Sequence, residues 1–228
     1  MNDGGGKSNQ PEQITRHDFK GPLSGILATV QNLLQIGHLS PRQIEMLQLA
    51  EASSLQLLDM INLSGELFKI ETGRFTLSAE PVPLAQLLRR AVENARLTFR
   101  VKDLTIELDL GVESDHLLPP ALGDALFCHS IIYNLLRNAC EAAPQDSRVR
   151  ICVAAADAVR ISIENQPAVP PEFRDSFFTK FATFGKKGGS GLGTYSAKML
   201  SEAQNGTLEL DIDDERNTTR LTLTLPRA

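Results

Sequence analysis

Two asparagines stand four residues apart in a strongly apolar segment of the sequence. Asn134 and Asn138 lie within residues 124–143, whose apolar spacing predicts a helix, so both amides fall on one face of it. Asparagine is a poor helix former in mid-helix, and its amide oxygen can ligate a hard cation. The pair therefore suggests a metal or ligand site, with a cap or a solvated helix face as the alternative.

A glycine-rich stretch runs into another predicted helix. Residues 185–193 read GKKGGSGLG, and the helix is expected over residues 192–203. Glycines let backbone amides approach an anion, the helix N-terminus adds partial positive charge, and Lys186 and Lys187 add two whole charges. The P-loop spacing and the strand of a Rossmann turn are both missing. The stretch therefore suggests a phosphate site of another kind, with a flexible linker as the alternative.

A histidine precedes an acid near the start of the first predicted helix. His17 is followed by Asp18 and, five residues after the histidine, by Pro22. A proline inside a helix disrupts the backbone by about 3 kcal/mol, so the surroundings must tolerate a kink. A lone histidine beside an acid has little specificity, so this string alone assigns no function.

The first half of the chain must supply a helical support for His17. Residues 13–72 have apolar positions at helical spacing and no strand signal. Gly37 breaks them into two helices, and the second begins at Ser40, Pro41 and Gln43, which form a capping-box start. The pattern predicts a helical hairpin that ends at Gly73.

The apolar stripe on this hairpin is wider than two helices can bury against each other. A second copy would cover the stripe at low cost and complete a four-helix bundle by two-fold symmetry. We therefore expect a homodimer. Packing of the hairpin against the rest of its own chain is the alternative.

The second half alternates helix and strand signals. Helices are expected at residues 83–100, 124–143 and 192–203, and strands at 104–110, 149–154, 159–164, 207–212 and 219–225. Because these do not follow a strict βαβ order, we expect a mixed sheet with helices on one face, an α/β two-layer sandwich. The predicted domains are a flexible arm (1–12), the hairpin (13–73), a linker (74–83) and the α/β domain (84–228).

Composition excludes several classes of protein. The net charge of −5 over 228 residues argues against the basic surface of a nucleic-acid binder. No apolar run reaches the ~18 residues that span a bilayer, and the N-terminus has no secretory signal. Three cysteines without CxxC spacing suit a reducing compartment. We therefore expect a cytoplasmic protein with no nucleic-acid partner and no direct membrane insertion.

Taken in order, four strings resemble those of the sensor histidine kinases of two-component signalling. They are HDFKGPL at residues 17–23, NLLRNA at 134–139, FFTK at 177–180 and GSGLG at 189–193. The resemblance covers residues 14–226. It implies a dimerisation and histidine-phosphotransfer bundle in the first half. It also implies a catalytic ATP-binding domain of the gyrase, Hsp90 and histidine-kinase type in the second.

The resemblance also implies roles for individual residues. His17 would accept the γ-phosphoryl group of ATP, with Asp18 as the general base for its ring. Asn138 would ligate Mg²⁺ through its amide oxygen, while Asn134 would help to position the metal and the phosphates. The residues implied to bind nucleotide are Asn134, Asn138, Glu164, Asn165, Lys180, Lys186, Lys187, Gly189, Gly191, Leu192 and Gly193. The implied reaction is autophosphorylation of His17 from Mg-ATP, followed by transfer to an aspartate of a response-regulator receiver domain.

Two positions depart from the family pattern. The first glycine box usually reads Asp-x-Gly-x-Gly, with the Asp accepting a hydrogen bond from adenine, whereas residues 164–170 here read ENQPAVP. Glu164 stands where the family has this Asp. This replacement predicts weaker nucleotide binding, or a shifted adenine held partly by Asn165. The second departure is Gly21, where the family carries Thr or Asn, and this predicts weak phosphatase activity.

Two other functions remain open at this stage. One is a non-catalytic histidine phosphotransfer or scaffold protein whose ATP-binding domain is degenerate, which the altered first glycine box favours. The other is an ATPase of the gyrase or Hsp90 type, which is disfavoured because that motif has Glu where this chain has Asn134. The sequence contains no sensor, so the signal would come from a separate protein or a missing domain.

Overall fold

The computed structural model describes residues 16–183 and 191–228. The chain separates into two compact units, residues 1–66 and residues 67–228, each of which is described by itself. The predicted arm at residues 1–12 lies outside the described residues. The boundary at residue 66 precedes the predicted end of the hairpin at Gly73, because the last turn of the second helix makes its contacts with the second unit.

The first unit is the predicted helical hairpin. It contains α1 (Arg16–Ile36) and the first part of α2 (Pro41–Glu71). The predicted capping box is present: the Ser40 amide donates to Gln43 Oε1 at 2.9 Å, and the Gln43 amide donates to Ser40 Oγ at 3.4 Å. These two bonds satisfy N–H groups that the first turn of α2 cannot pair within the helix. They confirm where the second helix begins.

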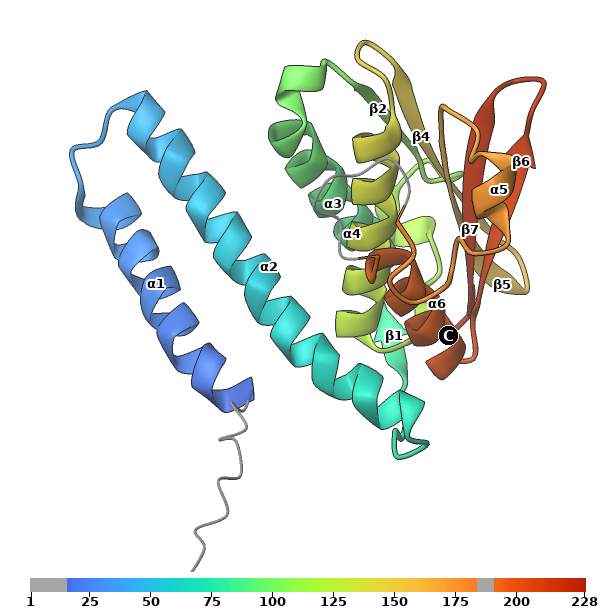
Figure 1. Ribbon diagram of the computed structural model, residues 1–228, viewed down its shortest axis with the longest axis horizontal. Helices are drawn as coiled ribbons and strands as arrows, with labels where there is room; N and C mark the ends of the chain where they lie inside the picture. The colour runs from blue at the N-terminus through green and yellow to red at the C-terminus, as the bar shows by residue number, and fades with distance from the viewer. Residues whose placement is uncertain (1–15, 184–190) are drawn as a thin grey trace, which may run out of the picture. The chain divides into compact units, whose positions relative to one another are not determined.

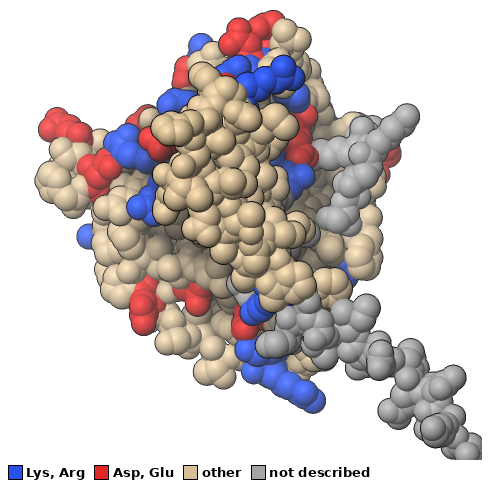
Figure 2. Space-filling model, turned by 90° about the vertical axis from the view of Figure 1, so that its left-hand side faces the viewer, with Lys and Arg blue, Asp and Glu red and all other residues tan. Residues whose placement is uncertain are grey.

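An apolar stripe on α1 stays uncovered. Leu23 and Val30 are buried, whereas Phe19, Ile26 and Leu33, also spaced seven residues apart, are 54%, 54% and 42% exposed. Residues 21–36 contain no charged side chain. Figure 2 looks onto the α1 side of the hairpin, where the central surface is largely uncharged. Exposed apolar surface of this kind is typical of interaction sites.

The second unit is built on a five-stranded sheet (Figure 1). Its strands, in spatial order, are β2 (Thr105–Asp109), β4 (Arg148–Ala155), β5 (Ala158–Asn165), β7 (Thr218–Pro226) and β6 (Thr207–Asp213). β2 and β4 are parallel and the other pairs are antiparallel. The helices α3 (Leu84–Thr98), α4 (Ala125–Ala142) and α6 (Gly193–Ala203) cover one face. This confirms the predicted mixed sheet with helices on one side.

Several short elements were not predicted. They are β1 (Glu80–Val82), which pairs with β3 (Ala121–Gly123), the single-turn helix α5 (Pro171–Arg174) and two 3₁₀ turns, η1 (Arg100–Lys102) and η2 (Asp115–Leu117). Runs of three or four residues are too short for periodicity to show. The β1–β3 pair joins the segment after α2 to the strand that leads into α4.

The core forms because the central strands alternate with a period of two. Ile151, Ile161 and Leu223 lie on β4, β5 and β7 and are almost fully buried on the helix side. The residues next to them along each strand point to the other face. The helices contribute the apolar counterpart, which includes Leu88, Phe127 and Leu200.

Hydrogen bonds, both local and long-range, fix the two ends of α4, the helix that carries the two asparagines. At its start, the Asp124 side chain accepts a hydrogen bond from the Phe127 amide at 3.0 Å. The buried Gln204 side chain, just after α6, accepts from the Asp124 amide at 3.1 Å. At its end, Lys102 Nζ donates to three carbonyls, those of Cys140, Glu141 and Ala143. A cation on the terminal carbonyls satisfies unpaired acceptors and opposes the helix dipole.

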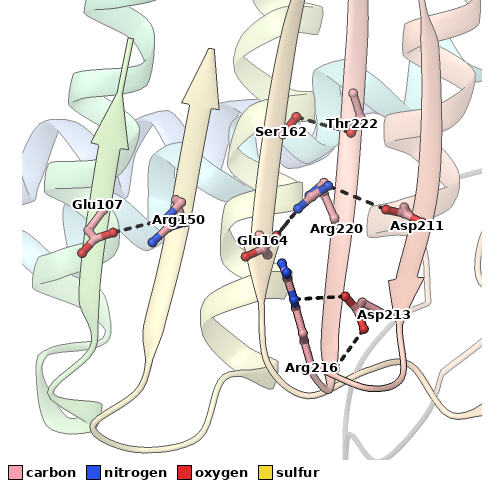
Figure 3. Close-up of polar contacts among 9 residues, drawn as sticks. All are labelled: Glu107, Arg150, Ser162, Glu164, Asp211, Asp213, Arg216, Arg220 and Thr222. Carbon is pink, nitrogen blue, oxygen red and sulfur yellow. Dashed lines mark hydrogen bonds and ion pairs between the residues drawn. The ribbon is translucent and has the colours of Figure 1, made fainter. Parts of the chain in front are cut away.

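The helix-free face of the sheet carries a row of alternating charges (Figure 3). The register places Glu107, Arg150, Glu164, Arg220 and Asp211 side by side on the five strands. Arg220 binds Glu164 at 2.5 Å and lies 3.8 Å from Asp211, while Arg150 Nε lies 3.4 Å from Glu107. The Glu164 carboxylate raises the pKa of Arg220. The row gives this face a hydrated, polar surface.

Within residues 16–183 and 191–228, none of the helices combines the length and the apolar character that a bilayer crossing requires.

Candidate functional site

The two asparagines of α4 face the start of α6. Asn134 and Asn138 are both half-buried. A Cβ atom placed on Gly193, the first residue of α6, would lie 3.5 Å from Asn138 Nδ2 and 3.7 Å from Asn134 Oδ1. The structure therefore brings together the two strings that were 50 residues apart in the sequence. The result is an amide-lined surface at the positive end of a helix.

Phe181 and Gly191 are joined by a backbone hydrogen bond just before α6. The Phe181 amide donates to the Gly191 carbonyl at 3.1 Å, and both residues have left-handed backbone angles, with φ of +67° and +63°. A Cβ on Gly191 would lie 2.4 Å from the Phe181 carbonyl carbon, so only glycine fits there. The predicted site residues Lys186, Lys187 and Gly189 lie outside the described residues. Leu192 precedes α6 and its carbonyl accepts from the Ser196 amide at 2.8 Å.

The structure does not bring Glu164 to this cluster. Its side chain lies on the helix-free face of β5 and is ion-paired with Arg220. Asn165, the next residue, is 6% exposed and lies on the same face of β5 as Ile161 and Ile163. Glu164 therefore lies away from this cluster, because adjacent strand residues point to opposite faces. Asn165 occupies the inward position instead.

Asn165 is held in a defined orientation. Its Nδ2 donates to the Gln166 carbonyl at 2.9 Å. This bond commits the amide's donor side to the backbone and leaves Oδ1 as its acceptor side. A residue in this position therefore offers an acceptor, as an aspartate would, but without a charge.

The segment that replaces the first glycine box is bound to the β6–β7 hairpin. The Ala168 amide donates to Asn217 Oδ1 at 2.9 Å, and the Val169 amide donates to Thr219 Oγ1 at 3.0 Å. Thr219 in turn donates to the Pro167 carbonyl at 2.8 Å. Amides that a glycine box would turn toward a ligand are thus paired within the protein. Residues 166–170 form a fixed wall.

Lys180 is bound to the last residue of α2. Its ammonium donates to Glu71 Oε1 at 2.6 Å, and the Tyr195 hydroxyl donates to the same oxygen at 2.7 Å. The hydrogen bond from Lys180 is the main cause that lowers the pKa of Glu71, and the bond to Glu71 raises the pKa of both Lys180 and Tyr195. All three residues belong to the second unit.

His17 and Asp18 lie in the first turn of α1, and their side chains are outside what the structure describes. Sequence reasoning missed Glu71, Tyr195, Asn217 and Thr219, because each acts on a residue at least 49 positions away. The inward position of Asn165 could have been predicted, because the alternation along β5 places it on the same face as Ile163.

Among the residues that the structure describes, no group of three or more His, Cys, Asp or Glu could hold a metal ion. The Asn134 and Asn138 side chains carry neutral amide oxygens, a ligand type that suits Mg²⁺ when the remaining ligands are phosphates and water. The donor set therefore fits a cation that arrives with a phosphate substrate.

Comparison with known proteins covers both units. Residues 123–228 match the family described as histidine kinase-, DNA gyrase B-, and HSP90-like ATPase. The sensory histidine kinase/phosphatase NtrB of Rhodobacter capsulatus is 26% identical over 226 residues, covering 92% of this chain and 60% of NtrB. GacS of Pseudomonas protegens is 30% identical over 86% of this chain and 22% of its own length. The chain thus spans at most 60% of these curated relatives.

Solved structures show the same fold. Full-length ShkA, crystallised in complex with AMPPNP, has a TM-score of 0.64 at 24% identity and covers 93% of this chain and 44% of its own. The Acinetobacter baumannii histidine kinase AdeS has a TM-score of 0.59 at 18% identity over 93% of this chain and 98% of its own. Together, the family match over residues 123–228, the similarity to NtrB and GacS, and the ordered strings at residues 17–23, 134–139, 177–180 and 189–193 support a sensor histidine kinase.

Proposed function

We propose that this chain is a histidine kinase core that phosphorylates His17 from Mg-ATP and passes the phosphoryl group to an aspartate of a response-regulator receiver. The observation that supports this most is the meeting of Asn134 and Asn138 with the first residue of α6. Neutral oxygen ligands beside a helix N-terminus suit a metal–triphosphate substrate. The match to an ATPase family over residues 123–228 points the same way.

The residues of the chain divide the work of binding the triphosphate. The amides of Asn134 and Asn138 would hold Mg²⁺, which neutralises charge on the transferring group. The α6 N-terminus and Lys186, Lys187 and Lys180 would attract the phosphates. The glycines at 189, 191 and 193 leave room for close backbone approach.

The chemical step takes place on His17. One ring nitrogen attacks the γ-phosphorus in line, an N–P bond forms, and the bond to the β,γ-bridging oxygen breaks with release of ADP. Asp18 accepts the hydrogen bond of the other ring nitrogen and so supports the positive charge that develops on the ring. A receiver carboxylate then takes the phosphoryl group and returns the imidazole.

The base of the nucleotide would be read by Asn165. Its oriented Oδ1 is the acceptor on the inward face of β5, where the exocyclic amino group of adenine can donate. The fixed wall at residues 166–170 offers fewer free amides than a glycine box. Affinity would then depend more on the phosphate side of the site.

The same fixed wall favours the second candidate, a phosphotransfer or scaffold protein whose nucleotide domain no longer binds ATP. The glycines and asparagines that remain on α4 and α6 favour the kinase. Measurements of nucleotide binding and of label transfer from ATP distinguish the kinase from the phosphotransfer or scaffold protein.

The uncovered stripe of Phe19, Ile26 and Leu33 supports a homodimer through a four-helix bundle. The other partners that we propose are a receiver domain and a separate or additional sensor, as expected for relatives of NtrB and GacS. A cytoplasmic location remains a prediction.

Phosphoryl transfer from labelled ATP tests the kinase. We expect γ-labelled ATP with Mg²⁺ to label the protein, and we expect His17→Gln or excess EDTA to abolish the label, because the first removes the acceptor and the second the metal. Acid should release the label, since a phosphoramidate is acid-labile, while alkali should not. Free phosphate without labelled protein would support an ATPase instead.

A pair of neighbouring substitutions on β5 tests the reading of the base. We expect Asn165→Ala to weaken Mg-ATP binding by about five- to thirtyfold, the cost of about 1–2 kcal/mol for one lost buried hydrogen bond. Glu164→Ala, on the opposite face, should leave affinity unchanged. Isothermal titration calorimetry measures both. Equal losses in the two variants would contradict the assignment.

Sedimentation equilibrium tests the dimer. The wild-type protein should behave as a dimer at micromolar concentration, and Ile26→Glu should yield folded monomer because it places a charge in the stripe. Glu51→Gln, a polar change at the contact between α1 and α2, should remain dimeric and serves as the control. A monomeric wild-type protein would remove the proposal.

The absence of a side chain at Gly21 predicts weak phosphatase activity toward the phosphorylated receiver. A Cβ on Gly21 would have no neighbour within 4 Å, so Gly21→Asn should fold normally. We expect this variant to speed the decay of the phosphorylated receiver above the wild-type rate, because an amide there can orient the attacking water. Rapid decay with the unchanged protein would contradict the prediction.

A further inference from the structure

Glu71 holds two residues that flank the start of α6. One carboxylate oxygen accepts hydrogen bonds from Lys180 at 2.6 Å and from Tyr195 at 2.7 Å. Glu71 is the last residue of α2, and Tyr195 is the third residue of α6. Lys180 directly precedes Phe181, whose amide donates to the Gly191 carbonyl. Three separate parts of the second unit therefore meet at this carboxylate.

The charge on Lys180 is balanced in this arrangement. Its ammonium lies 5.3 Å from the centre of the Tyr195 ring and 5.8 Å from that of Phe181, in addition to its contact with Glu71. The lysine side chain is 41% exposed and the glutamate 30%, so a strong competing anion can reach the pair from solvent. An exposed ion pair of this kind is weak enough to be exchanged.

The pair lies next to the surface on which we place the triphosphate. Phe181, adjacent to Lys180, is bonded to Gly191, and Tyr195 is in the first turn of the helix whose N-terminus faces Asn134 and Asn138. A phosphate chain there carries several negative charges. It would compete with the single charge of Glu71 for the lysine ammonium.

We propose that Glu71 is a positioning residue that holds Lys180, and that Lys180 exchanges Glu71 for a phosphate oxygen when Mg-ATP binds. The proposal rests on the proposed function. It involves no covalent step, only the exchange of one anionic partner for another. By linkage, the nucleotide and the contact of Glu71 oppose each other. Nucleotide binding thereby releases the last residue of α2.

Calorimetric titration of the full chain with Mg-ATP, and separately with adenosine, tests the exchange. Glu71→Gln should tighten Mg-ATP binding about two- to fivefold, the range expected from the loss of one exposed competing ion pair. Adenosine binding should not change, because adenosine has no phosphate. Glu107→Gln, which removes a carboxylate ion-paired to arginines on the helix-free face, is the matched control and should bind both ligands like the wild type.

Two further variants separate partner exchange from simple charge repulsion. In a Lys180→Met background, Glu71→Gln should have no further effect, whereas repulsion between Glu71 and the phosphates would persist there. Glu71→Asp keeps the charge but shortens the reach, so it should also tighten Mg-ATP binding. Melting temperatures of all variants check that each is folded.

Several results would overturn the inference. They are unchanged or weaker Mg-ATP binding in Glu71→Gln, an equal gain for adenosine, or a gain that persists without Lys180. A wild-type protein that binds neither ligand would refute the proposed function, and the exchange with it. A wild-type protein that binds Mg-ATP but shows no effect of Glu71 would refute the exchange alone.

Discussion

The packing of α4 against the buried face of the sheet is the contact on which the candidate site depends. Phe127, Ile131 and Leu135 lie on the buried side of this helix, and the asparagines lie on the part that turns toward α6. Gln204 and Lys102 join the two ends of the helix to the rest of the fold. The position of the two side-chain amides is therefore set by apolar burial and by capping of the helix ends. Neither of these interactions requires a bound ligand.

One face of the sheet carries charged side chains and the other is apolar and buried, and β5 contributes residues to both faces. Glu164 joins a hydrated row of charges, while Asn165 is buried on the helix side. A charge at the inward position would face the Gln166 carbonyl, whereas the neutral amide donates to it. This explains in physical terms why the inward residue is Asn, given the course of the chain after β5.

Of the two glycine-rich strings in the family pattern, this chain has glycines only in the second. The second keeps its glycines where α6 begins. Gly191 makes a close approach to Phe181 that a side chain would prevent, whereas a Cβ on Gly193 would be in ordinary contact with the two asparagines. The first contains no glycine, and its backbone amides donate hydrogen bonds to the side chains of Asn217 and Thr219. The amides of Ala168 and Val169 are therefore paired within the protein, whereas the backbone at Gly191 has no room for a side chain.

The sequence by itself determined the kinds of element and most of their limits, because helix and strand periodicity, the capping box at Ser40 and the glycine breaks act within a few residues. The order of four short strings also indicated the similarity to sensor histidine kinases that the comparisons support. The alternation of buried and exposed residues along β5 predicts that Asn165 points toward the helices. Aligning the sequence with the family motif instead placed Glu164 at the position of the adenine-binding Asp.

Only the tertiary structure decided which distant residues meet. Glu71 and Lys180 are 109 positions apart, and Val169 and Thr219 are 50 apart, so no local pattern links them. Such contacts follow from the order of strands in the sheet and from the burial of one face. Both are properties of the whole second unit, because long-range pairs form only after the core has brought their elements together.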